Sequence, residues 1–171
     1  MKVTLAKTAG FCFGVQRAVD TVYRVLEEVH EKPLDEQRSI YTYGPIVHNE
    51  TVIQKLAAEG VQVLESEEEL ATLHDGIVII RAHGVPKHIY ELLQKQRVEA
   101  VDASCPFVQK IQRLVQQHTA AGEEVFVTGN PEHPEVIGIM GWAEGGISAI
   151  PDIETAEKLP NGEGRSVVVV S

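Results

Sequence analysis

The sequence of 171 residues has few cysteines, no basic cluster and no long apolar run. Its two cysteines, Cys12 and Cys105, lie far apart and do not form the dense pattern of a disulfide-stabilised secreted domain. No apolar run approaches the roughly 20 residues that span a bilayer. The first ten residues also lack the apolar core of a secretory signal. These absences predict a soluble, cytosolic protein that does not associate with membranes.

The charge is strongly acidic: 15 Lys and Arg residues stand against 25 Asp and Glu residues, which gives a formal net charge of −10. Sequence-independent binding of nucleic acid depends on clustered Lys and Arg, so we expect no nucleic-acid partner. If such a protein binds an anion, it must do so with local groups rather than with its overall field.

Short β-branched runs alternate with longer amphipathic stretches along the whole chain, which predicts an α/β fold with mainly parallel sheets. The predicted strands are residues 3–6, 40–43, 61–64, 77–80, 99–101, 125–128, 147–150 and 167–170. The predicted longer helices are residues 15–31, 50–59, 87–96, 107–121 and 135–142. Residues 77–80 and 167–170 are apolar at every position, as expected for strands covered on both faces.

An internal repeat divides the chain into two similar parts. Residues 44–50 (GPIVHNE) align with residues 129–135 (GNPEHPE), and the glycine, histidine and glutamate match. Upstream of the two copies of this motif, Cys12 of the first copy aligns with Cys105 of the second. The repeat predicts a first α/β domain at residues 1–97 and a second at residues 98–171. The alternative, that any α/β chain shows loose self-similarity, stays open.

Five polar candidates follow predicted strands and lie close before predicted helices: Cys12, His48, His83, Cys105 and His133. The carboxyl ends of the strands are the edge where open α/β sheets bind ligands. Helix N-termini at this edge present unpaired N–H groups and a partial positive charge. We therefore expect these side chains to face a site that favours thiolates and phosphates.

The two cysteines occupy equivalent repeat positions with apolar neighbours, which favours thiolates on a soft metal centre. Iron–sulfur clusters are usually held by thiolates alone, whereas zinc generally takes four ligands, which histidines can complete. A buried core role and a nucleophilic thiol are the alternatives.

The three histidines, His48, His83 and His133, together with several helix N-termini, suit a small and highly charged anion such as a diphosphate. For any one of them, a solvent-facing loop residue is the alternative. Glu135 is the best candidate for an acid or base. Glu50 occupies the same place in the first copy, and the pattern alone does not choose between them.

Five motifs resemble the 4-hydroxy-3-methylbut-2-enyl diphosphate reductase family in the same order. They are residues 9–15 (AGFCFGV), 44–49 (GPIVHN), 81–85 (RAHGV), 102–106 (DASCP) and 133–136 (HPEV). The resemblance implies a [4Fe–4S] cluster held by three cysteines, one from each of three similar α/β domains. Carried over by position, the cluster ligands are Cys12 and Cys105. The residues that bind the substrate, mainly its diphosphate, are His48, His83 and His133, and the proton donor is Glu135.

The resemblance also implies the reaction. It is the reductive dehydroxylation of (E)-4-hydroxy-3-methylbut-2-enyl diphosphate to isopentenyl and dimethylallyl diphosphate in isoprenoid synthesis. Electrons would come from a small redox protein such as ferredoxin or flavodoxin, or from an NADPH-fed reductase. The family is longer than this chain, so we expect a third domain and a third cysteine beyond Ser171, and no turnover from residues 1–171 alone. A non-catalytic α/β module and a zinc-dependent phosphohydrolase remain the competing hypotheses.

Overall fold

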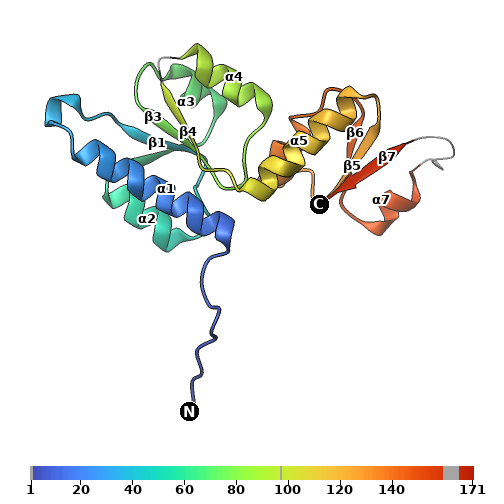
Figure 1. Cartoon of the computed structure of the whole chain (residues 1–171), viewed down its shortest axis with the longest axis horizontal. Coiled ribbons are helices and arrows are strands. Elements are labelled where there is room, and N and C mark those ends of the chain that lie inside the picture. The colour runs from blue at the N-terminus through green and yellow to red at the C-terminus, as the bar shows by residue number, and fades with distance from the viewer. Residues whose placement is uncertain (1, 97, 160–165) are drawn as a thin grey trace.

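The computed structural model describes residues 2–96, 98–159 and 166–171. It contains two separate parallel sheets with helices packed against them (Figure 1). The elements around the first sheet are α1 (Phe13–His30), a 3₁₀ turn (Leu34–Glu36), β1 (Ile40–Tyr43), α2 (Glu50–Ala58), β2 (Val61–Leu64), α3 (Glu67–Thr72), β3 (Ile77–Ile80), α4 (Lys87–Lys95) and β4 (Glu99–Asp102). Those around the second are α5 (Pro106–Ala120), β5 (Glu124–Thr128), α6 (Pro134–Met140), β6 (Ile147–Ile150), α7 (Ile153–Glu157) and β7 (Val167–Val170). The predicted α/β class is confirmed.

The two sheets share one topology. The first has the order β2-β1-β3-β4 and the second the order β6-β5-β7, and every pair is parallel. In each sheet the first strand of the repeat is central, and the next two strands lie on either side of it. The internal repeat found in the sequence is therefore also a repeat of strand order.

Helices cover both faces of the first sheet. Because the side chains of a strand alternate between faces, β3 contributes to the core on each side. Ile77 and Ile79 of β3 belong to the core cluster that includes α1 and α2. Val78 and Ile80 belong to the cluster that includes α3 and α4. All four residues are buried, as the unbroken apolar run predicts.

The second sheet is covered less completely. Helices α5 and α6 bury Val125, Val127 and Val170 in one core cluster. Val169 on the opposite side of β7 is 61 % exposed. The prediction that residues 167–170 are covered on both faces is therefore wrong in the described part of the chain, because β7 is an edge strand and its Val169 side chain is not covered.

The largest departure from the predicted elements is at residues 3–6. Residues 3–6 form no strand, because they pair with neither sheet, and they extend away from the first sheet as part of an exposed tail (Figure 1). The predicted domain boundary falls at residue 97, which lies outside the described residues. Strand β4 follows that position and pairs with β3 of the first sheet, so the sheets separate between β4 and α5.

In the part of the chain that the structure describes, no helix combines the length and the apolar character needed to cross a membrane.

Candidate functional site

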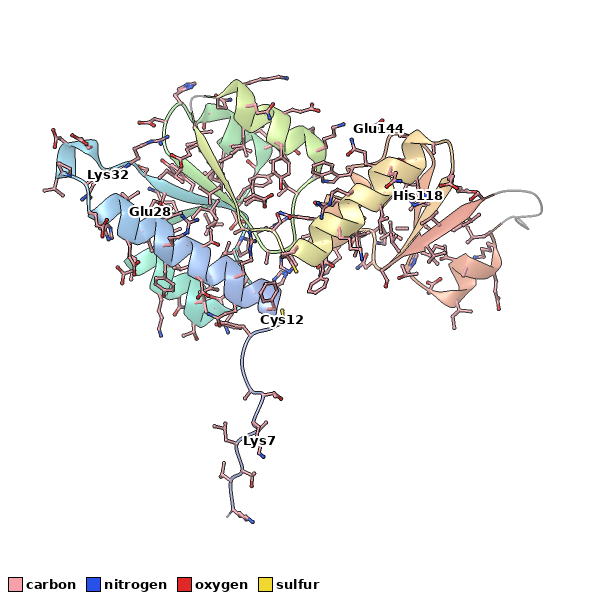
Figure 2. The ribbon with its side chains drawn as sticks, viewed as in Figure 1. Lys7, Cys12, Glu28, Lys32, His118 and Glu144 are labelled. Atoms are coloured by element: carbon pink, nitrogen blue, oxygen red, sulfur yellow. The ribbon has the colours of Figure 1, made fainter. Side chains whose placement is uncertain are left out.

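The two cysteines stand at equivalent places, each directly before a long helix. Cys12 is the N-cap residue of α1 and Cys105 is the N-cap residue of α5. Neither side chain makes a capping hydrogen bond, so both sulfur atoms remain available to a ligand. Both residues are free thiols. Figure 2 shows Cys12 at the point where the N-terminal tail enters α1, beside the start of α5.

The starts of α1 and α5 pack directly against each other. A Cβ atom added to Gly14 would lie 2.5 Å from Sγ of Cys105, so only glycine allows the sulfur to rest on the first turn of α1. Arg17 of α1 donates through Nη1 to the carbonyl of Ser104 at 2.8 Å. The backbone N–H of Cys105 donates to the carbonyl of Ala82 at 2.9 Å. These contacts bring both helix N-termini and the loop after β3 to one place.

A cavity of about 260 Å³ opens at this junction. Its lining includes Cys12, Cys105, His83 and Glu135, with an apolar wall formed in part by Val15, Phe107 and Ile111. Glu50, which the sequence left as an equal candidate, does not line this cavity. The cavity therefore distinguishes Glu135 from its repeat counterpart.

The three histidines form one cluster, although they come from three different loops. The ring centroids of His48 and His83 are 4.7 Å apart, those of His83 and His133 are 5.9 Å apart, and those of His48 and His133 are 6.3 Å apart. His48 follows β1, His83 follows β3 and His133 follows β5. The predicted convergence of these side chains at the carboxyl edge of the strands is thus present in the structure.

Local structure fixes which nitrogen of His133 is free. His133 is the N-cap residue of α6, and its Nδ1 accepts a hydrogen bond from the backbone N–H of Glu135 at 3.2 Å. A nitrogen that accepts this bond carries no proton, so in this arrangement the ring proton sits on Nε2. His133 can therefore donate an Nε2–H bond to an anion. The same cap places Glu135 in the first turn of α6.

Burial and nearby positive charge shape the electrostatics of the cluster. Burial, followed by the charges of His48, Arg81 and His133, lowers the pKa of His83 from 6.5 to about 4. His83 is therefore neutral near pH 7 in the free protein. An anion placed among these groups would offset the repulsion that lowers this pKa.

Arg81 is a cation at the site, and its role was missed in the sequence. Burial lowers the pKa of its guanidinium, and its buried Nε has no hydrogen-bond partner among the described residues. Its guanidinium packs so closely against Gly44 that a Cβ atom there would collide with it, and Gly44 has a φ of 68°. Arg81 belongs to the segment that carries His83, but the packing of this partly buried cation against Gly44 is a long-range contact that no local pattern reveals.

The described residues offer two thiols rather than a closed metal site. No three His, Cys, Asp or Glu side chains in the described ranges are arranged to hold a metal ion together. The arrangement instead combines two sulfur atoms at one cavity, three adjacent imidazoles and a carboxylate. Such a set can supply part of a thiolate ligand shell, hydrogen-bond donors for an anion, and a group that holds a proton.

Comparison with known proteins identifies the family of the chain. The model of the LytB protein family matches residues 3–171. The chain is 43% identical over 169 residues to a 4-hydroxy-3-methylbut-2-enyl diphosphate reductase of Thermoanaerobacter sp., covering 98% of the chain and 56% of that protein. A solved structure of E-1-hydroxy-2-methyl-but-2-enyl-4-diphosphate reductase from Plasmodium falciparum matches with a TM-score of 0.84 and 29% identity, over 96% of this chain and 49% of that one.

A second solved structure extends the comparison. It is described as (E)-4-hydroxy-3-methyl-but-2-enyl diphosphate reductase, the terminal enzyme of the non-mevalonate pathway. It matches with a TM-score of 0.76 and 30% identity, over 98% of this chain and 66% of that one. The chain spans about half the length of the curated relatives it matches.

Proposed function

The chain belongs to the LytB protein family, and from that premise we propose that it carries part of the active site of a 4-hydroxy-3-methylbut-2-enyl diphosphate reductase. Its homology to such reductases, which are oxidoreductases, covers almost the whole chain. One observation carries the proposal: Cys12, Cys105, His83 and Glu135 line a single cavity. Because the relatives are nearly twice as long, the whole reaction is proposed for a protein of their length.

The two thiols fit ligands of an iron–sulfur cluster. Both sulfur atoms are free of capping bonds, both stand at helix N-termini that favour negative charge, and both face a largely apolar cavity. Gly14 leaves room for the sulfur of Cys105 at the first turn of α1. We assign Cys12 and Cys105 as two of the three cysteine ligands of a [4Fe–4S] cluster. Such a cluster supplies electron transfer and a Lewis-acidic iron to the substrate hydroxyl.

The imidazole cluster is the proposed diphosphate site. His48, His83 and His133 lie within 6.3 Å of one another by ring centroids, so one diphosphate can reach all three. Charge-assisted hydrogen bonds contribute about 1.5–3 kcal/mol each. Three of them give about 5–9 kcal/mol before entropic costs, compared with about 8 kcal/mol for micromolar binding. Arg81 adds positive charge close enough to lower the pKa of His83.

Glu135 is the proposed proton donor. It lines the cavity beside both cysteines, and the cap formed with His133 fixes its position in the first turn of α6. In the proposed reaction the allylic C–O bond breaks and the oxygen leaves as water after taking up one proton. Two electrons from a reduced ferredoxin- or flavodoxin-type protein and a second proton complete the C–H bond of isopentenyl or dimethylallyl diphosphate.

Anaerobic reconstitution with iron and sulfide tests the cluster assignment. An excess of dithiothreitol can supply the ligands that this chain lacks. We expect thiolate-to-iron absorption with the unmodified chain, and its loss in Cys12→Ser and Cys105→Ser. Colourless, stoichiometric zinc binding would instead favour a phosphohydrolase, and a cooperative melt without any bound metal would favour a non-catalytic module.

Titration with inorganic diphosphate tests the anion site separately. We expect His83→Gln to weaken binding by about tenfold, the equivalent of one hydrogen bond of about 1.4 kcal/mol. His74 is exposed and outside the cluster, so His74→Gln is the matched control. Equal affinities of the two variants would remove His83 from the proposed site.

A further inference from the structure

A single buried amide connects two of the segments that carry the histidines. Gln112 of α5 is only 3 % exposed, although glutamine is usually a surface residue. Its Nε2 donates to the carbonyl of Val85 at 3.4 Å and to the carbonyl of Gly138 at 3.3 Å. Val85 follows His83 by two residues in the loop after β3, and Gly138 lies in α6, which His133 caps. The side chain therefore bonds both to the His83 loop and to the helix of His133.

The carbonyl of Val85 is held from two directions. Besides Gln112, the indole Nε1 of Trp142 donates to it at 2.9 Å. The carbonyl of Gly138 lies near the C-terminal end of α6, where Trp142 N–H bonds to Ile139 instead of continuing the helical pattern. Gln112 therefore satisfies a helix-end carbonyl that lacks its usual partner.

The packing around these bonds leaves little room for movement. A Cβ atom at Gly84, where φ is 69°, would lie 2.6 Å from Nε2 of Gln112. A Cβ atom at Gly138 would lie 3.3 Å from the carbonyls of His83 and Gly84. The backbones of the His83 loop and α6 are thus in close contact, with the Gln112 amide bonded to both.

Few side chains could replace this amide. An NH₂ group carries two protons and no charge, so it can donate to two carbonyls at once. Glutamate at this position would place carboxylate oxygens against the carbonyls of Val85 and Gly138. Methionine has nearly the same length but no donor, so it would leave the carbonyl of Gly138 without its bond to Gln112.

We propose that Gln112 is a positioning residue that sets the spacing between His83 and His133. His48 and His83 belong to loops of the first sheet, so their spacing does not depend on Gln112. His133 belongs to the second sheet, and its distance from His83 is set across the junction that Gln112 bonds. Loss of the amide should therefore disturb the contacts of His133 while preserving the contact between His48 and His83.

NMR of histidine-labelled protein tests this selectivity without any ligand. In Gln112→Met we expect ring-proton contacts to persist between His48 and His83 and to be lost between His83 and His133. Gln116→Met is the matched control, because Gln116 lies one turn further along α5 and its side-chain amide donates to exposed Glu144. Unchanged contacts in Gln112→Met, or equal loss of the contact between His48 and His83, would overturn the proposal.

Trp142→Phe provides a second variant if Gln112→Met does not fold. It removes the other donor to Val85 and leaves the Gln112 amide in place. We expect the same selective change with a smaller displacement of the His83 resonances. Equal displacement of the His48 and His83 resonances would contradict the proposal that the bonds to Val85 position His83 relative to His133.

Diphosphate binding provides a further readout, which rests on the proposed function. We expect Gln112→Met to weaken inorganic diphosphate binding by about tenfold relative to Gln116→Met, because a shift of about 1 Å in a binding group has costs of this order or larger. Absence of binding by the unmodified chain would refute the proposed anion site, while the NMR result would still decide the role of Gln112. Equal affinities of the two variants, with binding by the unmodified chain, would overturn the positioning role.

Discussion

Replacing His83 by glutamine should make folding less sensitive to acid between pH 6.5 and pH 4. Burial, then the charges of His48, Arg81 and His133, lowers the pKa of His83 from 6.5 to about 4. Between these values the unfolded chain binds a proton at this residue and the folded chain does not. The free energy of unfolding therefore falls as the pH decreases through this window. The contribution of His83 is fully present above pH 6.5 and is lost towards pH 4.

The size of the effect follows from the shift. A lowering from 6.5 to about 4 corresponds to about 3 kcal/mol, since one pKa unit is about 1.4 kcal/mol. The ring is only partly buried, and solvent screening reduces such a contribution. We therefore expect about 1–2 kcal/mol, which is a large share of the roughly 5–15 kcal/mol that stabilises an ordinary domain.

Urea unfolding at pH 7 and at pH 4.5 measures this difference. Trp142 is the only tryptophan of the chain, and its indole bonds to Val85, two residues after His83, so its fluorescence reports on the same junction. Between the two pH values, the unmodified chain should lose about 1–2 kcal/mol more stability than His83→Gln does. His74→Gln should behave like the unmodified chain.

An equal loss in all three proteins would refute the reasoning, because it would show that His83 does not resist protonation in the folded state. Four surface carboxylates also have lowered pKa values. Their contributions are lost only as the pH falls through those lowered values, and they are common to all three proteins. The carboxylates are Asp75, Glu123, Glu144 and Asp152.

Two further predictions concern the cavity. Gly14→Ala should destabilise the fold by about 1–3 kcal/mol, because the added Cβ meets the sulfur of Cys105. Gly146→Ala is the control, because its added Cβ meets no atom within 4 Å, and it should change the urea midpoint little. Equal urea midpoints of the two variants would contradict the contact between Gly14 and Cys105. In a full-length relative, the substitution equivalent to Glu135→Gln should keep diphosphate affinity and abolish turnover, and normal turnover would remove the proposed proton donor.

Much of the framework could be predicted from the sequence because it depends on local patterns. The strands at residues 40–43, 61–64, 77–80 and 147–150 have the predicted bounds, since short apolar runs between helical periods leave few alternatives. The predicted order of strands and helices also placed the three histidines after strands at one edge, and parallel strands bring such positions together. Residues 3–6 show the limit of this reasoning, because a strand pattern does not say whether a partner strand lies beside it.

The contacts that shape the site were beyond local pattern. Gly14 meets Cys105, Arg81 lies against Gly44, and Gln112 bonds to Val85 and Gly138. Each contact joins residues that are far apart in the sequence and that belong to different elements. Sequence spacing can place a residue at an edge, but it cannot identify the side chain from another element that fixes its position.

The central claim is that the two sulfur atoms face the same cavity, and dibromobimane tests it directly. This reagent becomes strongly fluorescent when two neighbouring thiols displace both of its bromides. Cys12 and Cys105 are the only cysteines of the chain, so the reaction needs no substitution. We predict rapid fluorescence at one reagent per chain, and its loss in Cys12→Ser and Cys105→Ser. Separate alkylation of the two thiols by two reagents, without the fluorescent cross-link, would contradict the proposed site.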